Sequence, residues 1–82
     1  MLLVEVVVPA LGRQYDFELE ETAKIDVLIR EMAAVICQKE RCQFIDNEQG
    51  LSLYSQAYGT RLLPEAALWE CGVENGQRLI LV

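Results

Sequence analysis

The chain has 82 residues, 52% of them hydrophobic and 24% charged, and we expect one domain spanning residues 1–82. This composition is too apolar for an intrinsically disordered chain. The net charge of −6 makes nucleic acid and anionic membrane surfaces poor partners, because both are negatively charged, and a basic patch on another protein is a better candidate.

The first residues and the cysteines together indicate a cytoplasmic protein. Met1–Pro9 has no basic leader, is interrupted by Glu5 and is too short to cross a membrane. The three cysteines, Cys37, Cys42 and Cys71, are an odd number, which favours reduced thiols over disulfide bonds. We therefore expect a cytoplasmic location without membrane insertion.

The first two elements form a predicted β-hairpin. Leu2–Val8 is rich in β-branched residues and reads as a strand, with the side that carries Glu5 facing water. Leu3 and Val7 share that side, since side chains alternate along a strand. After a turn at Pro9–Arg13, Tyr15–Glu20 alternates apolar and acidic residues, which predicts a second, half-buried strand.

A helix of about four turns should follow. Thr22 is a candidate for its N-cap, with Asp26 as an alternative, and the helical pattern fades near Lys39. Apolar residues recur at helical spacing and predict one buried stripe. The stripe consists of Ile25, Leu28, Ile29, Met32, Val35 and Ile36.

The second half of the chain contains three shorter predicted strands. Arg41–Gly50 is the least readable segment, although its Phe44 and Ile45 suggest a loop that turns apolar side chains inward. The expected strands are Leu51–Tyr54, Arg61–Leu63 and Gln77–Val82, with one helical turn at Pro64–Glu70 and a turn at Asn75-Gly76. In these strands Leu51, Leu53, Leu79 and Leu81 should point into the core.

The order of these elements predicts an α+β β-grasp fold, a mixed sheet of four to five strands covered by one helix. An apolar sheet face needs an amphipathic helix to cover it, and the first and last strands then lie parallel at the centre. A ferredoxin-like fold is the competitor, but it requires a helix directly after the first strand and a second full helix.

Residues that carry catalytic or metal chemistry are scarce. The chain has no histidine, which removes histidine-based acid–base catalysis and histidine metal sites, and it has no glycine-rich phosphate loop. Cys37 and Cys42 have the first spacing of a plant-type ferredoxin cluster, but Ile45 stands where the next ligand would be. We expect no cofactor, no metal and no enzymatic activity.

Trp69 is either a binding anchor or a lid on the core, and the lid is favoured.

The chain resembles the YukD/EsaB-like ubiquitin-like proteins associated with bacterial type VII secretion. The similarity spans nearly the whole chain and is strongest in the closing motif Leu68-x-x-Cys71-Gly72-Val73-x-Asn75-Gly76-x-x-Leu79, with Tyr15-Asp16 as a further match. Gln77 departs from the acidic residue common in the family. The resemblance implies a cytoplasmic accessory or regulatory role in secretion, with a component of the secretion machinery as partner and without conjugation.

Conjugation and sulfur transfer require a flexible Gly-Gly tail, whereas this chain ends in the strand residues Leu79-Ile80-Leu81-Val82. We therefore expect an interaction module, with a ubiquitin-like modifier or sulfur carrier as the alternative.

The predicted binding face is the outer side of the sheet, away from the helix. Its candidate residues are Leu3, Val7, Tyr54, Arg78, Ile80 and Val82, with Ser52 beside them. A contiguous aliphatic set suggests a protein interface, and tyrosine and arginine are enriched in binding hot spots. The alternative is a moderately apolar sheet face without a partner, and the interface is favoured by analogy, because ubiquitin-like domains commonly bind through this face. A third reading is a domain that self-associates through this face into a homodimer.

Overall fold

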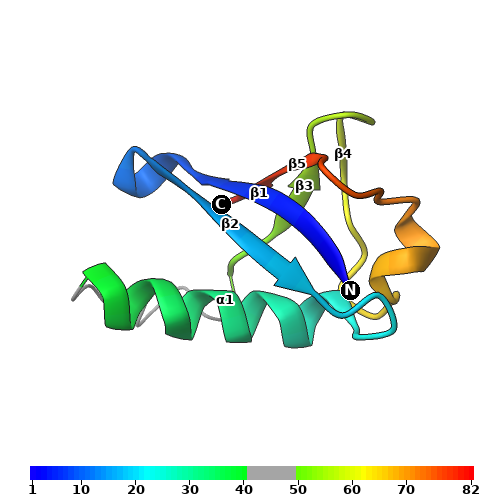
Figure 1. Ribbon diagram of the computed structural model, residues 1–82, viewed down its shortest axis with the longest axis horizontal. Helices are drawn as coiled ribbons and strands as arrows, with labels where there is room; N and C mark the ends of the chain where they lie inside the picture. Colours follow the sequence, from blue (N-terminus) through cyan, green and yellow to red (C-terminus); the bar gives the residue numbers. More distant parts are fainter. Residues whose placement is uncertain (41–49) are drawn as a thin grey trace.

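The computed structural model describes residues 1–40 and 50–82. Five strands form one mixed sheet in the order β2-β1-β5-β3-β4 (Figure 1). They span Leu2–Val8 (β1), Arg13–Leu19 (β2), Leu53–Ser55 (β3), Thr60–Arg61 (β4) and Arg78–Leu81 (β5). One α-helix, α1 (Ile25–Glu40), runs along one face of the sheet, and the short 3₁₀ helices η1 (Pro9–Leu11) and η3 (Leu68–Cys71) lie in the connections.

The first and last strands are central neighbours. β1 and β5 pair in parallel, with Val6 opposite Leu79, while β2 pairs antiparallel with β1 on its other side. β3 pairs antiparallel with β5 and with β4. The predicted architecture, a mixed sheet covered by one helix, is therefore confirmed, with five strands.

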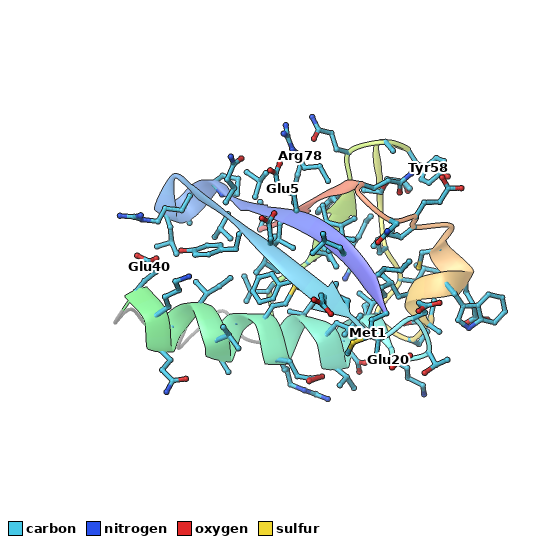
Figure 2. The ribbon with its side chains drawn as sticks, in the orientation of Figure 1. Met1, Glu5, Glu20, Glu40, Tyr58 and Arg78 are labelled. Atoms are coloured by element: carbon cyan, nitrogen blue, oxygen red, sulfur yellow. The ribbon has the colours of Figure 1, made fainter. Side chains whose placement is uncertain are left out.

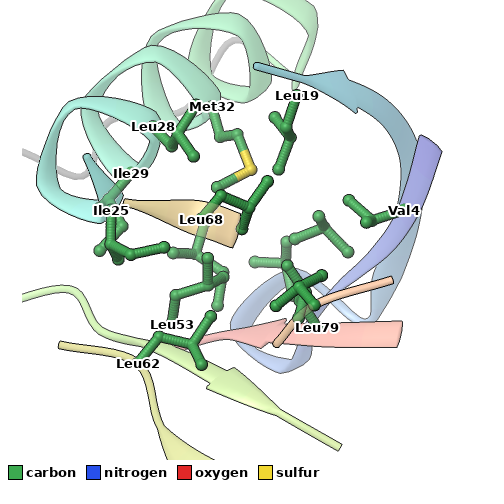
Figure 3. Close-up of a cluster of buried hydrophobic side chains, with 14 of the residues drawn as sticks. Val4, Leu19, Ile25, Leu28, Ile29, Met32, Leu53, Leu62, Leu68 and Leu79 are labelled. Carbon is green, nitrogen blue, oxygen red and sulfur yellow. The ribbon is translucent and has the colours of Figure 1, made fainter. Parts of the chain in front are cut away.

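The core fills the space between α1 and the inner face of the sheet (Figure 3). Alternate residues of β1 and β5, together with Leu53 of β3, are almost completely buried there, as the strand alternation predicts. From the sheet these are Val4, Val6, Val8, Leu53, Leu79 and Leu81, and from the rest of the chain Ile25, Met32, Ile36 and Leu68 are buried to the same degree. Among residues 1–40 and 50–82, no helix covers the other face of the sheet.

The start of α1 differs in part from the expectation. Backbone carbonyls take the place of a Thr22 cap, while an oxygen of the alternative candidate Asp26 accepts a hydrogen bond from the Val27 amide (2.8 Å). The amide of Ile25 donates to the Ala66 carbonyl (2.9 Å), and that of Asp26 donates to the Pro64 carbonyl (3.0 Å). These bonds satisfy amides that a helix leaves unpaired in its first turn. The Thr22 hydroxyl instead lies 3.3 Å from a carboxylate oxygen of Glu20, so the prediction of a Thr22 cap is wrong.

The buried side of α1 is also rotated from the predicted stripe. Five of the six residues in the predicted stripe are buried, but the sixth, Val35, is 50% exposed. Ala33, which is outside the predicted stripe, is buried. At about 100° per residue, Val35 lies about 60° to one side of Met32 and Ala33 about 100° to the other. The helix thus turns toward the Ala33 side, and the Val35 side stays open beside β2.

The shorter elements are displaced by one to a few residues from their predicted ranges. β3 begins at Leu53, and Leu51 packs against the core from outside the strand, partly buried. β4 covers Thr60–Arg61, one residue earlier than predicted, and the expected helical turn is η3. The expectations for Phe44, Ile45 and Cys42 lie outside the described residues.

Candidate protein-binding surface

Five of the six predicted binding residues belong to the strands β1, β5 and β3, and Val82 follows directly after β5. Leu3 and Val7 alternate with the buried valines of β1, and Arg78 and Ile80 alternate with the buried leucines of β5. Tyr54 lies between the buried Leu53 and Ser55 of β3. Because alternate side chains of a strand point to opposite faces, these residues face away from α1.

Strand register brings four of the six residues together. Ile80 lies opposite Val7 on one side and opposite Tyr54 on the other, so the three form a row across the sheet. Val82 follows Ile80 on the same side, and its backbone exchanges hydrogen bonds of 2.6 and 3.0 Å with Ser52. Val7 and Ile80 are partly buried, while Tyr54 is 37% and Val82 is 49% exposed. We call Val7, Tyr54, Ile80 and Val82 the outer-face patch.

Leu3 is separated from this patch by an ion pair. Glu5 and Arg78 lie opposite each other on β1 and β5, and the Arg78 guanidinium donates to the Glu5 carboxylate (Figure 2). Leu3 is four residues from Val7 along an extended strand, on the far side of this pair. The expected set of four contiguous aliphatic residues is therefore three, with Leu3 apart. Arg78 borders the patch with its charge already paired.

Arg61 is a neighbour of the patch that the sequence reasoning did not include. It lies opposite Tyr54 in the pairing of β3 with β4, is exposed, and its Nε donates a hydrogen bond to the Ser52 hydroxyl (3.2 Å). Among residues 1–40 and 50–82 it has no ion pair. The sequence carried no clear signal for it, since Leu62 and Leu63 are both leucine and only the structure shows that Leu62 is buried and Arg61 faces outward.

Trp69 does not act as a lid on the core. It is 61% exposed, while the preceding Leu68 is completely buried. In η3 the chain advances about 120° per residue, so adjacent side chains cannot share one side, and Leu68 occupies the core. The Trp69 amide donates to the Glu21 carbonyl (3.0 Å), which places this residue near the start of α1 rather than beside the outer-face patch.

The two described cysteines, Cys37 and Cys71, are both partly buried. Cys71 is a partly buried free thiol, and burial raises its pKa, which lowers the fraction of reactive thiolate. Cys37 is partly buried on α1. Within the described ranges, no three histidine, cysteine or acidic residues are placed to hold a metal ion. None of the helices described has the length and apolar character of a membrane span.

Each residue of the closing motif has a place in the fold. Leu68, Val73 and Leu79 are buried in the core, and Gly72 ends η3 in the left-handed conformation, at φ 74°. The Asn75 side-chain oxygen accepts a hydrogen bond from the Leu3 amide (2.7 Å), and the adjacent Gly76 amide donates to the Leu3 carbonyl (2.7 Å). Asn75 and Gly76 thus tie the turn before β5 to the first strand. The motif supports this fold and carries no side chain of the outer-face patch.

Three comparisons relate this chain to known proteins and structures. No family model and no curated protein matches the chain. The ubiquitin-like domain of an Arabidopsis thaliana protein superimposes with a TM-score of 0.73 at 20% identity, covering 99% of this chain and 74% of that one. The ubiquitin of Caldiarchaeum subterraneum gives 0.67 at 17% identity, covering 98% and 89%. The chain therefore has the ubiquitin-like β-grasp fold.

Proposed function

We propose that the chain is a non-enzymatic ubiquitin-like interaction module that binds a protein partner through the outer-face patch. The observation that carries the proposal is the row Val7–Ile80–Tyr54 on the face of the sheet opposite α1. Apolar side chains that meet on a surface mark contact sites, and a neighbouring tyrosine and arginine are typical hot-spot residues. Tyr54 and Arg61 supply both types here.

The charges around the patch favour a partner whose contact surface has acidic or neutral residues where it meets the outer-face patch. Arg61 is exposed beside Tyr54, and the guanidinium of Arg78 lies on the other border of the patch, paired with Glu5. The rest of the molecule carries the net charge of −6, which favours basic residues farther out on the partner. Such a partner would contact the patch with apolar residues.

As partner class we propose a component of the bacterial type VII secretion machinery, in a cytoplasmic accessory or regulatory role. The support is the resemblance of the closing motif and of Tyr15-Asp16. Because the residues of the closing motif stabilise the fold, the resemblance supports a fold shared with that family more strongly than a partner shared with it. The identity of the captured protein is therefore the decisive information about the secretion role.

A covalent modifier or sulfur carrier is the alternative function. That chemistry needs a flexible segment that reaches into an enzyme. Leu81 and Val82 are not such a segment, because Leu81 is buried and Val82 exchanges two backbone hydrogen bonds with Ser52.

Affinity capture from the host, with the wild type and two variants, tests the proposal. Ile80→Asp places a charge in the patch and should reduce capture of the partner by roughly tenfold or more. Leu63→Asp is the matched control, since Leu63 is 57% exposed and lies outside the patch, and it should retain capture. Equal loss with both variants, or none with Ile80→Asp, would remove the patch as the binding site.

The captured material also separates the alternatives. A covalent adduct in the intact mass of the chain would favour the modifier function. Capture of a second copy of the chain, lost on Ile80→Asp, would favour self-association through the same patch.

A further inference from the structure

The long edge of the sheet is a second surface with binding capacity, separate from the outer-face patch. β2 ends the strand order on one side and, among the described residues, pairs only with β1 over its seven residues. The opposite edge, β4, has only two residues. Proteins usually keep edge strands short or protect them, because unpaired backbone groups can pair with another chain.

The pairing of β1 fixes which β2 residues present their backbone groups at this edge. The Glu5 amide donates to the Gln77 carbonyl (3.0 Å), and the Leu3 carbonyl accepts from Gly76, so these groups point away from β2. In an antiparallel ladder their partners then direct their own N–H and C=O groups outward. The partners of Leu3, Glu5 and Val7 are Glu18, Asp16 and Gln14, which therefore face the open edge.

Below this edge lies a groove between β2 and α1. It has a volume of about 340 Å³ and is lined by Phe17 and Tyr15 of β2 and by Val35, Ile36 and Lys39 of α1, among others. Phe17 is only partly buried, and Val35 is 50% exposed because the helix is rotated toward Ala33. The Lys39 ammonium lies 5.7 Å from the centre of the Tyr15 ring. The groove thus combines aromatic and aliphatic side chains with the polar residues Gln14, Asp16 and Lys39.

The opposite side of β2 is acidic. Asp16 and Glu18 are exposed and alternate with Tyr15 and Phe17, which line the groove, and the exposed Glu20 follows directly after β2. A strand added at the edge would place every second side chain against the groove and the others beside these carboxylates, since side chains alternate. The first set should be apolar and the second set basic.

We propose that the β2 edge and its groove bind an extended peptide segment of a protein partner in which apolar residues alternate with lysine or arginine. The peptide would form hydrogen bonds with the backbone of Gln14, Asp16 and Glu18, as in other cases of strand addition. A second copy of this chain fits poorly, because pairing two β2 strands would bring acidic residues opposite acidic residues. The acidic row therefore selects against self-pairing and for a basic segment.

An NMR titration with two synthetic peptides of equal composition tests the pattern. The first alternates four lysines with three valines, and the second carries the same residues in the order Lys-Lys-Val-Val-Lys-Lys-Val. The alternating peptide should shift the amide signals of Gln14, Asp16 and Glu18 and bind roughly tenfold more tightly than the second peptide. Equal affinity, or shifts spread over all acidic surfaces, would overturn the proposal.

Variants of the groove and the edge provide the matched controls. Val35→Lys should reduce affinity for the alternating peptide by roughly tenfold, whereas Ala34→Lys, the same charge change at an exposed neighbour outside the groove, should have a much smaller effect. Asp16→Pro removes an edge-facing amide without removing a bond to β1 and should abolish binding, whereas Asp16→Asn should retain part of it. Equal effects within each pair would contradict strand addition.

This test is independent of the proposed function, because the two surfaces are on different parts of the sheet. Ile80→Asp should leave the affinity for the alternating peptide unchanged. Loss of peptide binding in that variant would place the peptide on the outer-face patch and overturn the assignment to β2.

Discussion

Leu79 and Ile80 are adjacent in sequence and have opposite environments. Leu79 is completely buried between the sheet and α1, whereas Ile80 faces the uncovered side and is partly buried by its neighbours in the sheet. The difference follows from strand alternation, which the sequence indicates for β1 through the acidic Glu5 and which the structure extends to β5 through its parallel pairing with β1.

Truncation of these two residues should therefore have unequal costs. Leu79→Ala should lower the free energy of unfolding by about 2–5 kcal/mol, because it leaves a cavity in the core. Ile80→Ala should lower it by about 1 kcal/mol, as is usual for a partly exposed position. Urea unfolding of both variants measures the difference. Equal costs, or a larger one for Ile80, would mean that β5 presents its other face to the core.

The Glu5–Arg78 ion pair could not be predicted from the two residues alone, because it depends on how their strands pair. Arg78 was predicted as a cationic member of the binding face, and it does lie on that face. Its charge is paired with Glu5, a residue 73 positions away, and that pairing depends on the register of two strands. Exposed ion pairs contribute only about 0–1 kcal/mol, so the main effect here is to separate Leu3 from the patch.

At the scale of elements, the strands with strict alternation were predicted well and the elements shaped by packing were not. β1, β2 and β5 have the predicted inward residues, because period-two patterns leave one apolar side. The rotation of α1 depends on how the helix seats against the sheet, so Val35 and Ala33 could not be assigned from a helical pattern alone. Exposure of Trp69 depends on η3 placing Leu68 in the core.

The hydrogen bond between the Asn75 side chain and the Leu3 amide allows a test of whether the closing motif serves the fold. Asn75→Ala should lower the free energy of unfolding by about 1 kcal/mol, because the Leu3 amide loses the side-chain oxygen that accepts its hydrogen bond. Asn75→Asp keeps an oxygen acceptor at this position and should be closer to wild type. Urea unfolding compares them. If the alanine variant is as stable as wild type but loses partner capture, Asn75 serves binding rather than the fold.

At the scale of the whole molecule, one sheet offers two distinct surfaces. α1 covers the inner face, which leaves the outer-face patch at the centre of the opposite side and the β2 edge at its margin. The sequence indicated the first surface, because its residues follow from alternation and from the central position of β1 and β5. It did not indicate the second, which depends on strand order, ladder geometry and the rotation of α1.

The most direct test of the central claim is methyl cross-saturation of the labelled chain in complex with its captured partner. Irradiation of the partner should attenuate the methyl signals of Val7, Ile80 and Val82 and leave those of the buried Leu79 and Leu81 nearly unchanged. Attenuation confined to Val35, Leu63 or other methyl groups away from the outer-face patch, with Ile80 unaffected, would contradict the account.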